Sequence, residues 1–190
     1  MSNRVLVLYA STHGHTAKIA DRIGAVLREQ GVHARVRRLD EHTPRLEPEE
    51  FDGFVVGASV HAGHHQHRAI AWIAEHRTTL DRHPSAFFSV SLTAADDTDE
   101  ARDVTRQLID DVLDETGWTP RLTQAFAGAL QFKEYNFATR VVMRLMAKRI
   151  EHQTDRPVDV HEDTDYTDWD AVERFALAVA ASLRPTEVPS

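Results

Sequence analysis

The chain contains one hydroxyl-rich turn whose residue types and spacing suit phosphate binding. An apolar run at residues 5–9 leads into it, and helical spacing of Ile19, Ile23 and Leu27 follows it. The first N–H groups of a helix have no partner inside the helix and lie at the positive end of its dipole. Hydroxyls and a flexible glycine beside them complete an anion site. The turn consists of Ser11, Thr12, His13, Gly14, His15 and Thr16.

The same turn excludes several common phosphate motifs. It has no lysine where a P-loop needs one, and Gly14 is its single glycine, so the dinucleotide fingerprint is missing. The strand ends at residues 9–11 and 57–59 carry no acidic side chain, which excludes a receiver-type site. A Ser/Thr turn that only caps a helix is the alternative. Its position after the first strand favours a mononucleotide phosphate site.

Short apolar runs alternate with helical patterns along the chain. Strands are predicted at residues 5–9, 33–39, 54–58, 86–90 and 122–128, and helices at 14–30, around 70–74, at 104–113 and from 167 onward. This alternation predicts an α/β fold of the flavodoxin-like, doubly wound type. The five-stranded parallel sheet would have helices on both faces. Ligands in such folds bind at the carboxyl ends of the strands.

A single domain is expected over residues 1–184, with a disordered tail at 185–190. Residues 131–165 are too long for a plain connection and predict a helical insertion after or within the fifth strand. Thr167, with Asp170 three residues later, is predicted to cap the last helix.

Composition narrows the function classes. The chain has 190 residues, a formal net charge of −8 and no cysteine. The charge argues against nucleic-acid binding, and no apolar run is long enough to span a bilayer. The N-terminus shows no signal-peptide pattern. A cytoplasmic protein is expected, with peripheral contact at the inner face of the cell membrane left open.

The turn resembles the FMN phosphate loop of flavodoxins, Ser/Thr-x-Thr-Gly-x-Thr, with His13 in place of the usual threonine. Further segments are similar to the flavodoxin-like, menaquinone-dependent protoporphyrinogen IX dehydrogenases of bacterial haem biosynthesis. These segments are residues 57–59 with 63–64, 84–87 with 89–90, 127–130 and 166–169. The resemblance implies an FMN-dependent enzyme that oxidises protoporphyrinogen IX to protoporphyrin IX and reduces menaquinone or ubiquinone.

The resemblance also implies which loops bind the flavin. Besides the whole phosphate turn, two segments would border the isoalloxazine ring, and His61 is the candidate for stacking on it. No catalytic acid or base stands out. The two segments comprise Ser59, Val60, His61, Ala62, Gly63 and His64, and Ser91, Leu92, Thr93 and Ala94.

Two further clusters have competing interpretations. Four histidines lie close together in the sequence and could bind a metal ion, but no carboxylate completes a ligand set, so no metal is predicted. They are His61, His64, His65 and His67. Arg140, Arg144 and Lys148 form a basic stripe at helical spacing. That stripe would contact substrate carboxylates or an anionic membrane surface, or it is an ordinary surface helix.

Three alternative functions stay open at this level. A flavodoxin-type electron carrier would have no substrate of its own. An NAD(P)H-dependent quinone reductase would use the same fold with another donor. A binding module without flavin would be colourless.

Overall fold

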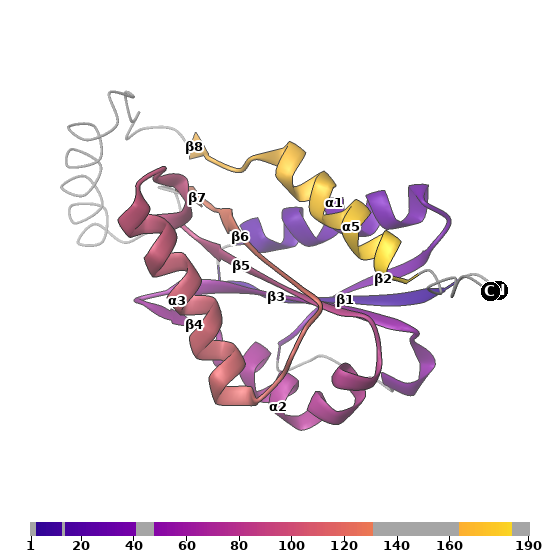
Figure 1. The fold of residues 1–190 in the computed structure, drawn as a ribbon. Coiled ribbons are helices and arrows are strands. Elements are labelled where there is room, and N and C mark those ends of the chain that lie inside the picture. Colours follow the sequence, from indigo (N-terminus) through magenta and orange to yellow (C-terminus); the bar gives the residue numbers. More distant parts are fainter. Residues whose placement is uncertain (1–2, 13, 41–47, 131–163, 184–190) are drawn as a thin grey trace, which may run out of the picture.

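The computed structural model describes residues 3–12, 14–40, 48–130 and 164–183 (Figure 1). A parallel sheet lies at its centre, with its strands in the order β2-β1-β3-β5-β6. This order is that of the flavodoxin-like doubly wound fold and confirms the predicted fold class. The strands are β1 (Arg4–Ala10), β2 (His33–Arg38), β3 (Gly53–His61), β5 (Ser85–Ser91) and β6 (Leu122–Ala127).

Helices cover both faces of the sheet, as Figure 1 shows. One face packs against α1 (His15–Glu29) and α5 (Trp169–Ser182). The other face packs against α2 (His67–Arg82) and α3 (Asp99–Thr116). Short 3-10 turns lie at η1 (Pro48–Glu50) and η2 (Thr93–Ala95).

Strand alternation divides the core into two layers. In β1, Val5 and Val7 face α1 and α5, whereas Leu6 and Leu8 face α2. All four side chains are fully buried, and such burial contributes about 1.5–3 kcal/mol per large apolar side chain. Gly57 in the central strand makes room for Phe88, because a Cβ there would lie 2.0 Å from the Phe88 ring.

The prediction that Thr167 caps the last helix was wrong. Asp168, not Thr167, is the N-cap, and its carboxylate accepts from the Ala171 amide at 2.9 Å. Thr167 instead directs its hydroxyl to the Ala127 carbonyl. The Thr167 hydroxyl is therefore engaged in a tertiary hydrogen bond and does not cap the helix.

Two short antiparallel pairings extend the structure at one edge. In the first, β4 (His64–His65) folds back on the end of β3, with His61 opposite His64. In the second, β7 (Ala129–Leu130) pairs with β8 (Thr164–Asp165). We call the second pair the ribbon. It joins the two ends of the predicted insertion, whose residues 131–163 lie outside the described residues, as does the tail. Within the described residues, no helix is long and apolar enough to cross a membrane.

Candidate functional site

Three loops meet at the edge of the sheet where the parallel strands end, which we call the carboxyl edge. The phosphate turn follows β1, the β3–β4 hairpin follows β3, and η2 follows β5 (Figure 1). Adjacent parallel strands bring these segments together, as the sequence predicted. His13 lies outside the described residues.

The phosphate turn has an open helix N-terminus. Gly14 is the N-cap with a φ of 80°, and its amide donates to Ser11 Oγ at 3.0 Å. A Cβ on Gly14 would meet no atom of the described residues within 4 Å. Among the described residues, no backbone oxygen accepts from the amides of His15 and Thr16. These two N–H groups and the positive end of the α1 dipole can hold an anion.

The second loop is a tight hairpin, because β3 runs to His61, beyond the strand predicted at residues 54–58, and pairs with β4. Its two turn residues both have positive φ, 51° at Ala62 and 84° at Gly63, as in the type I′ turns that join antiparallel strands. At its base, the Ser59 hydroxyl is buried and has no hydrogen-bond partner among the described residues. A buried hydroxyl of this kind is costly unless a ligand or water satisfies it.

Gln66 ties this hairpin to the phosphate turn, a role that no motif in the sequence predicted. Its side-chain amide donates to Thr12 Oγ1 at 2.8 Å, and its backbone amide donates to the Ser59 carbonyl at 3.1 Å. The only signal in the sequence was its place directly before a helical pattern. The contact with Thr12 spans 54 positions of the chain.

His65 anchors the other side of the hairpin. Its Nε2 lies 2.8 Å from Ser89 Oγ on β5, and its ring packs edge-on against Phe87. Burial lowers the pKa of His65 to about 4, so the ring is neutral at pH 7. Within the described part of the chain, no group of three or more histidine or carboxylate side chains is placed to hold a metal ion.

The third loop is held by Ser91, which is 5% exposed. Its hydroxyl accepts from the Ala94 amide at 3.3 Å, and its carbonyl accepts from the Gly128 amide at 3.0 Å. Leu92 next to it is 41% exposed. The loop therefore offers an apolar side chain and backbone groups beside the end of β6.

The ring of His15 points away from the anion position. Its Nε2 lies 2.6 Å from Thr167 Oγ1, and the ring is packed near Trp169. Burial lowers the pKa of His15, and the nearby Asp165 carboxylate opposes that shift. The backbone N–H of His15, and not its ring, therefore lies on the side where an anion would bind.

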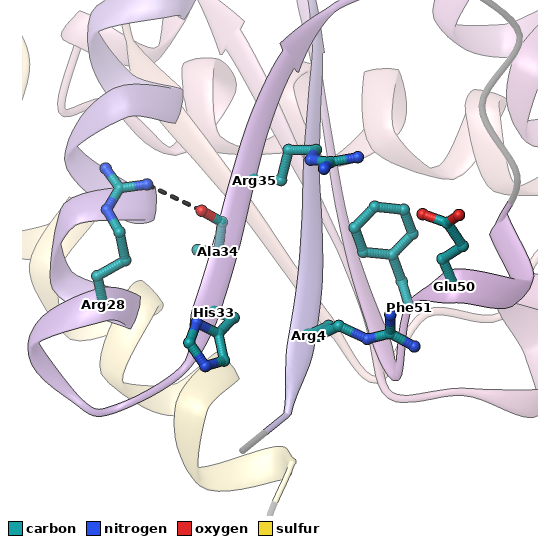
Figure 2. A pocket seen from close by; sticks show the side chains of 7 residues that line it. All are labelled: Arg4, Arg28, His33, Ala34, Arg35, Glu50 and Phe51. Carbon is teal, nitrogen blue, oxygen red and sulfur yellow. Dashed lines mark hydrogen bonds between the residues drawn. The ribbon is translucent and has the colours of Figure 1, made fainter. Parts of the chain in front are cut away.

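A pocket lies at the opposite edge of the sheet, where the parallel strands begin. Figure 2 shows the side chains that line it. Arg4 and His33 begin β1 and β2, and the Arg35 guanidinium lies 5.8 Å from the centre of the Phe51 ring. Arg28 donates to the Ala34 carbonyl at 3.0 Å. These residues lie at the amino ends of the strands, so they take no part in a site at the carboxyl edge.

The predicted basic stripe, Arg140, Arg144 and Lys148, lies outside the described residues. The described residues on either side of this segment belong to the ribbon. Leu130 and Thr164 are paired at the carboxyl edge, close to the end of β6.

Sequence comparisons agree with the resemblance of the phosphate turn. Residues 6–157 match the flavodoxin domain family. The chain is 34% identical over 189 residues to protoporphyrinogen IX dehydrogenase (quinone) of Leishmania major, covering 99% of this chain and 78% of that protein. It is 31% identical over 180 residues to the protein of the same name from Escherichia coli K12, covering 93% and 94%.

Solved structures show the same fold. The oxidised flavodoxin 1 of Bacillus cereus aligns with a TM-score of 0.56 at 16% identity, covering 95% of this chain and 99% of the flavodoxin. A flavodoxin-like WrbA-type protein from Agrobacterium tumefaciens aligns with a TM-score of 0.53 at 12% identity, covering 96% and 98%. At these identities the likeness concerns the fold alone.

Proposed function

Because this chain belongs to the flavodoxin domain family, we propose that it is an FMN-dependent oxidoreductase that oxidises protoporphyrinogen IX and reduces a quinone. The observation that carries the proposal is the open anion site at the carboxyl edge, in a chain 34% and 31% identical to proteins named for this reaction. Each two electrons and two protons removed from the porphyrinogen reduce one quinone to a quinol, so complete oxidation to the porphyrin consumes three quinones. A bare electron carrier would need no such substrate.

The described residues fit FMN. The amides of His15 and Thr16 and the hydroxyls of the turn suit its phosphate. The Ser59 hydroxyl, which has no partner among the described residues, suits a polar group of the ligand. FMN, when bound, supplies the redox chemistry. The chain itself binds and orients the cofactor: Gln66 and His65 hold the hairpin in place, and Ser91 holds the third loop.

The electron donor and acceptor are tested in one anaerobic experiment. Protoporphyrinogen IX added to the purified flavoprotein should bleach the flavin absorption, and quinone added next should restore it. Bleaching by NADPH but not by porphyrinogen would favour a quinone reductase. Bleaching by dithionite alone would favour an electron carrier, and a colourless protein that takes up no flavin would contradict flavin chemistry altogether. Menaquinone and ubiquinone compared in the second step would identify the acceptor.

FMN should bind more tightly than FAD, by at least about tenfold, or about 1.4 kcal/mol. The turn offers one phosphate site and lacks the glycines that accommodate a dinucleotide. Calorimetric titration of the flavin-free protein with each flavin measures the difference. Equal or tighter FAD binding would show that the site extends beyond a mononucleotide.

We propose that the basic stripe contacts either the porphyrinogen propionates or an anionic membrane surface beside the carboxyl edge. Changing Arg140, Arg144 and Lys148 to glutamine should leave FMN affinity unchanged. It should raise the KM for porphyrinogen several-fold if the stripe binds substrate. If the stripe binds lipid, it should instead reduce sedimentation with anionic vesicles, and added salt should mimic the change in the wild type.

A charge-matched control replaces Arg4, Arg28 and Arg35 with glutamine at the amino ends of the strands, which removes the same charge at the opposite edge. If the stripe variant matches the wild type in both assays, the stripe is an ordinary surface helix face.

A further inference from the structure

One hydrogen-bonded chain connects the phosphate turn to the ribbon. His15 Nε2 lies 2.6 Å from Thr167 Oγ1, and the Thr167 hydroxyl donates to the Ala127 carbonyl at 2.9 Å. Ala127 is the last residue of β6, and Thr167 lies two residues after β8. The ring of His15 is 6% exposed, so water does not compete freely for these bonds.

The direction of these bonds follows from counting protons. A threonine hydroxyl has one proton, and that of Thr167 is given to Ala127. Its oxygen therefore accepts from His15, which must carry its proton on Nε2. Asp165 Oδ1, 3.5 Å from the same nitrogen, supports this arrangement, and it also accepts from the Thr167 amide at 2.9 Å. His15 Nδ1 is buried without a hydrogen-bond partner among the described residues, so the polar contacts of the ring lie on the Nε2 side, toward Thr167 and Asp165.

The chain continues to the third loop and the ribbon. Gly128, which follows Ala127, donates to the Ser91 carbonyl at 3.0 Å and accepts from the Tyr166 amide at 3.3 Å. Ala129 then begins the ribbon by pairing with Asp165. Thr167 thus stands where the end of β6, the ribbon and the start of α5 meet.

We propose that His15 and Thr167 are positioning residues that couple occupancy of the phosphate site to the position of the ribbon. The backbone of His15 belongs to the anion site, and its ring binds Thr167, so a shift of one end is transmitted to the other. The proposal rests on FMN binding as the proposed function describes it. It assigns to His15 a role through its ring, whereas only the backbone N–H of His15 would hold the FMN phosphate.

The test replaces Thr167 with valine, which removes the hydroxyl and keeps the shape. The FMN dissociation constant should rise about 2- to 10-fold, the range for a net intramolecular hydrogen bond. Hydrogen–deuterium exchange of residues 128–130 and 164–166 should slow when FMN binds to the wild type, and this protection should be lost in the variant. T167S should restore both properties, since it keeps the hydroxyl. T116V is the matched control, because Thr116 Oγ1 donates to Val112 O inside α3, at the other end of the sheet.

A second variant, H15F, tests the same hydrogen bond from its other end and so keeps the proposal testable if T167V misfolds. If the bond carries the coupling, the double variant should bind FMN no more weakly than the weaker single variant. Wild-type affinity and wild-type protection in T167V would overturn the proposal, and so would additive losses in the double variant. FMN binding with no change in exchange at the ribbon would overturn it as well. If the wild type binds no FMN, the proposed function fails on its own. The coupling is then tested with inorganic phosphate as the anion, and an absence of ribbon protection by phosphate would overturn it.

Discussion

Replacing Thr16 with valine is expected to weaken FMN binding by about 10- to 150-fold. Thr16 lies in the first turn of α1 and is 1% exposed, so its hydroxyl is held in a site with little competing water. A hydrogen bond to a charged phosphate contributes about 1.5–3 kcal/mol, and each 1.4 kcal/mol corresponds to a tenfold change in affinity. Valine keeps the branched shape of threonine, so the change removes the donor and leaves the packing in place.

The dissociation constant is measured by quenching of FMN fluorescence during titration of the flavin-free protein. T116V again serves as the control, because it removes a buried hydroxyl far from the carboxyl edge. Unchanged affinity in T16V would show that Thr16 does not contact the phosphate. Failure of the wild type to bind any flavin would remove the basis of the proposed function.

The free energy of unfolding is expected to fall by up to about 3 kcal/mol through His65 alone as the pH decreases from about 7 to about 4. The pKa of His65 is lowered from 6.5 to about 4 in the folded state because the ring is buried. Between these values the unfolded chain binds a proton that the folded chain does not. The contribution is therefore complete above pH 6.5 and is lost as the pH falls through about 4, at 1.36 kcal/mol per pKa unit.

Urea denaturation of the wild type and of H65Q over this pH range measures the effect. Glutamine does not titrate and can still form a hydrogen bond with Ser89, so the unfolding free energy of H65Q should depend less steeply on pH. H33Q, which removes an exposed histidine from β2, should follow the wild type. Parallel pH profiles for the wild type and H65Q would show that the His65 ring is protonated in the folded protein as readily as in the unfolded chain.

Loss of the contact between His65 and Ser89 should also weaken FMN binding in H65A, because this contact anchors the hairpin.

The sequence by itself determined the fold class and the position of the hydroxyl-rich turn that opens α1. Apolar alternation in β1 and helical spacing in α1 are local patterns, and both report directly which face of an element is buried. The open N-terminus of α1 can also be read from a local pattern, because Gly14 and the hydroxyls beside it are consecutive residues. The resemblance to the flavodoxin family was confirmed by the family match over residues 6–157.

The tertiary structure alone decided which side chains hold the site together. The contact of Gln66 with Thr12 spans 54 positions, and that of His15 with Thr167 spans 152. Periodicity indicates that a side chain is buried but not which distant group lies opposite it. Thr167 and Asp168 are both good helix caps by residue type, and Asp168 caps α5 because Thr167 is engaged by Ala127 and His15. Partner choice of this kind depends on the packing of α5 against α1 and β6, which no local pattern contains.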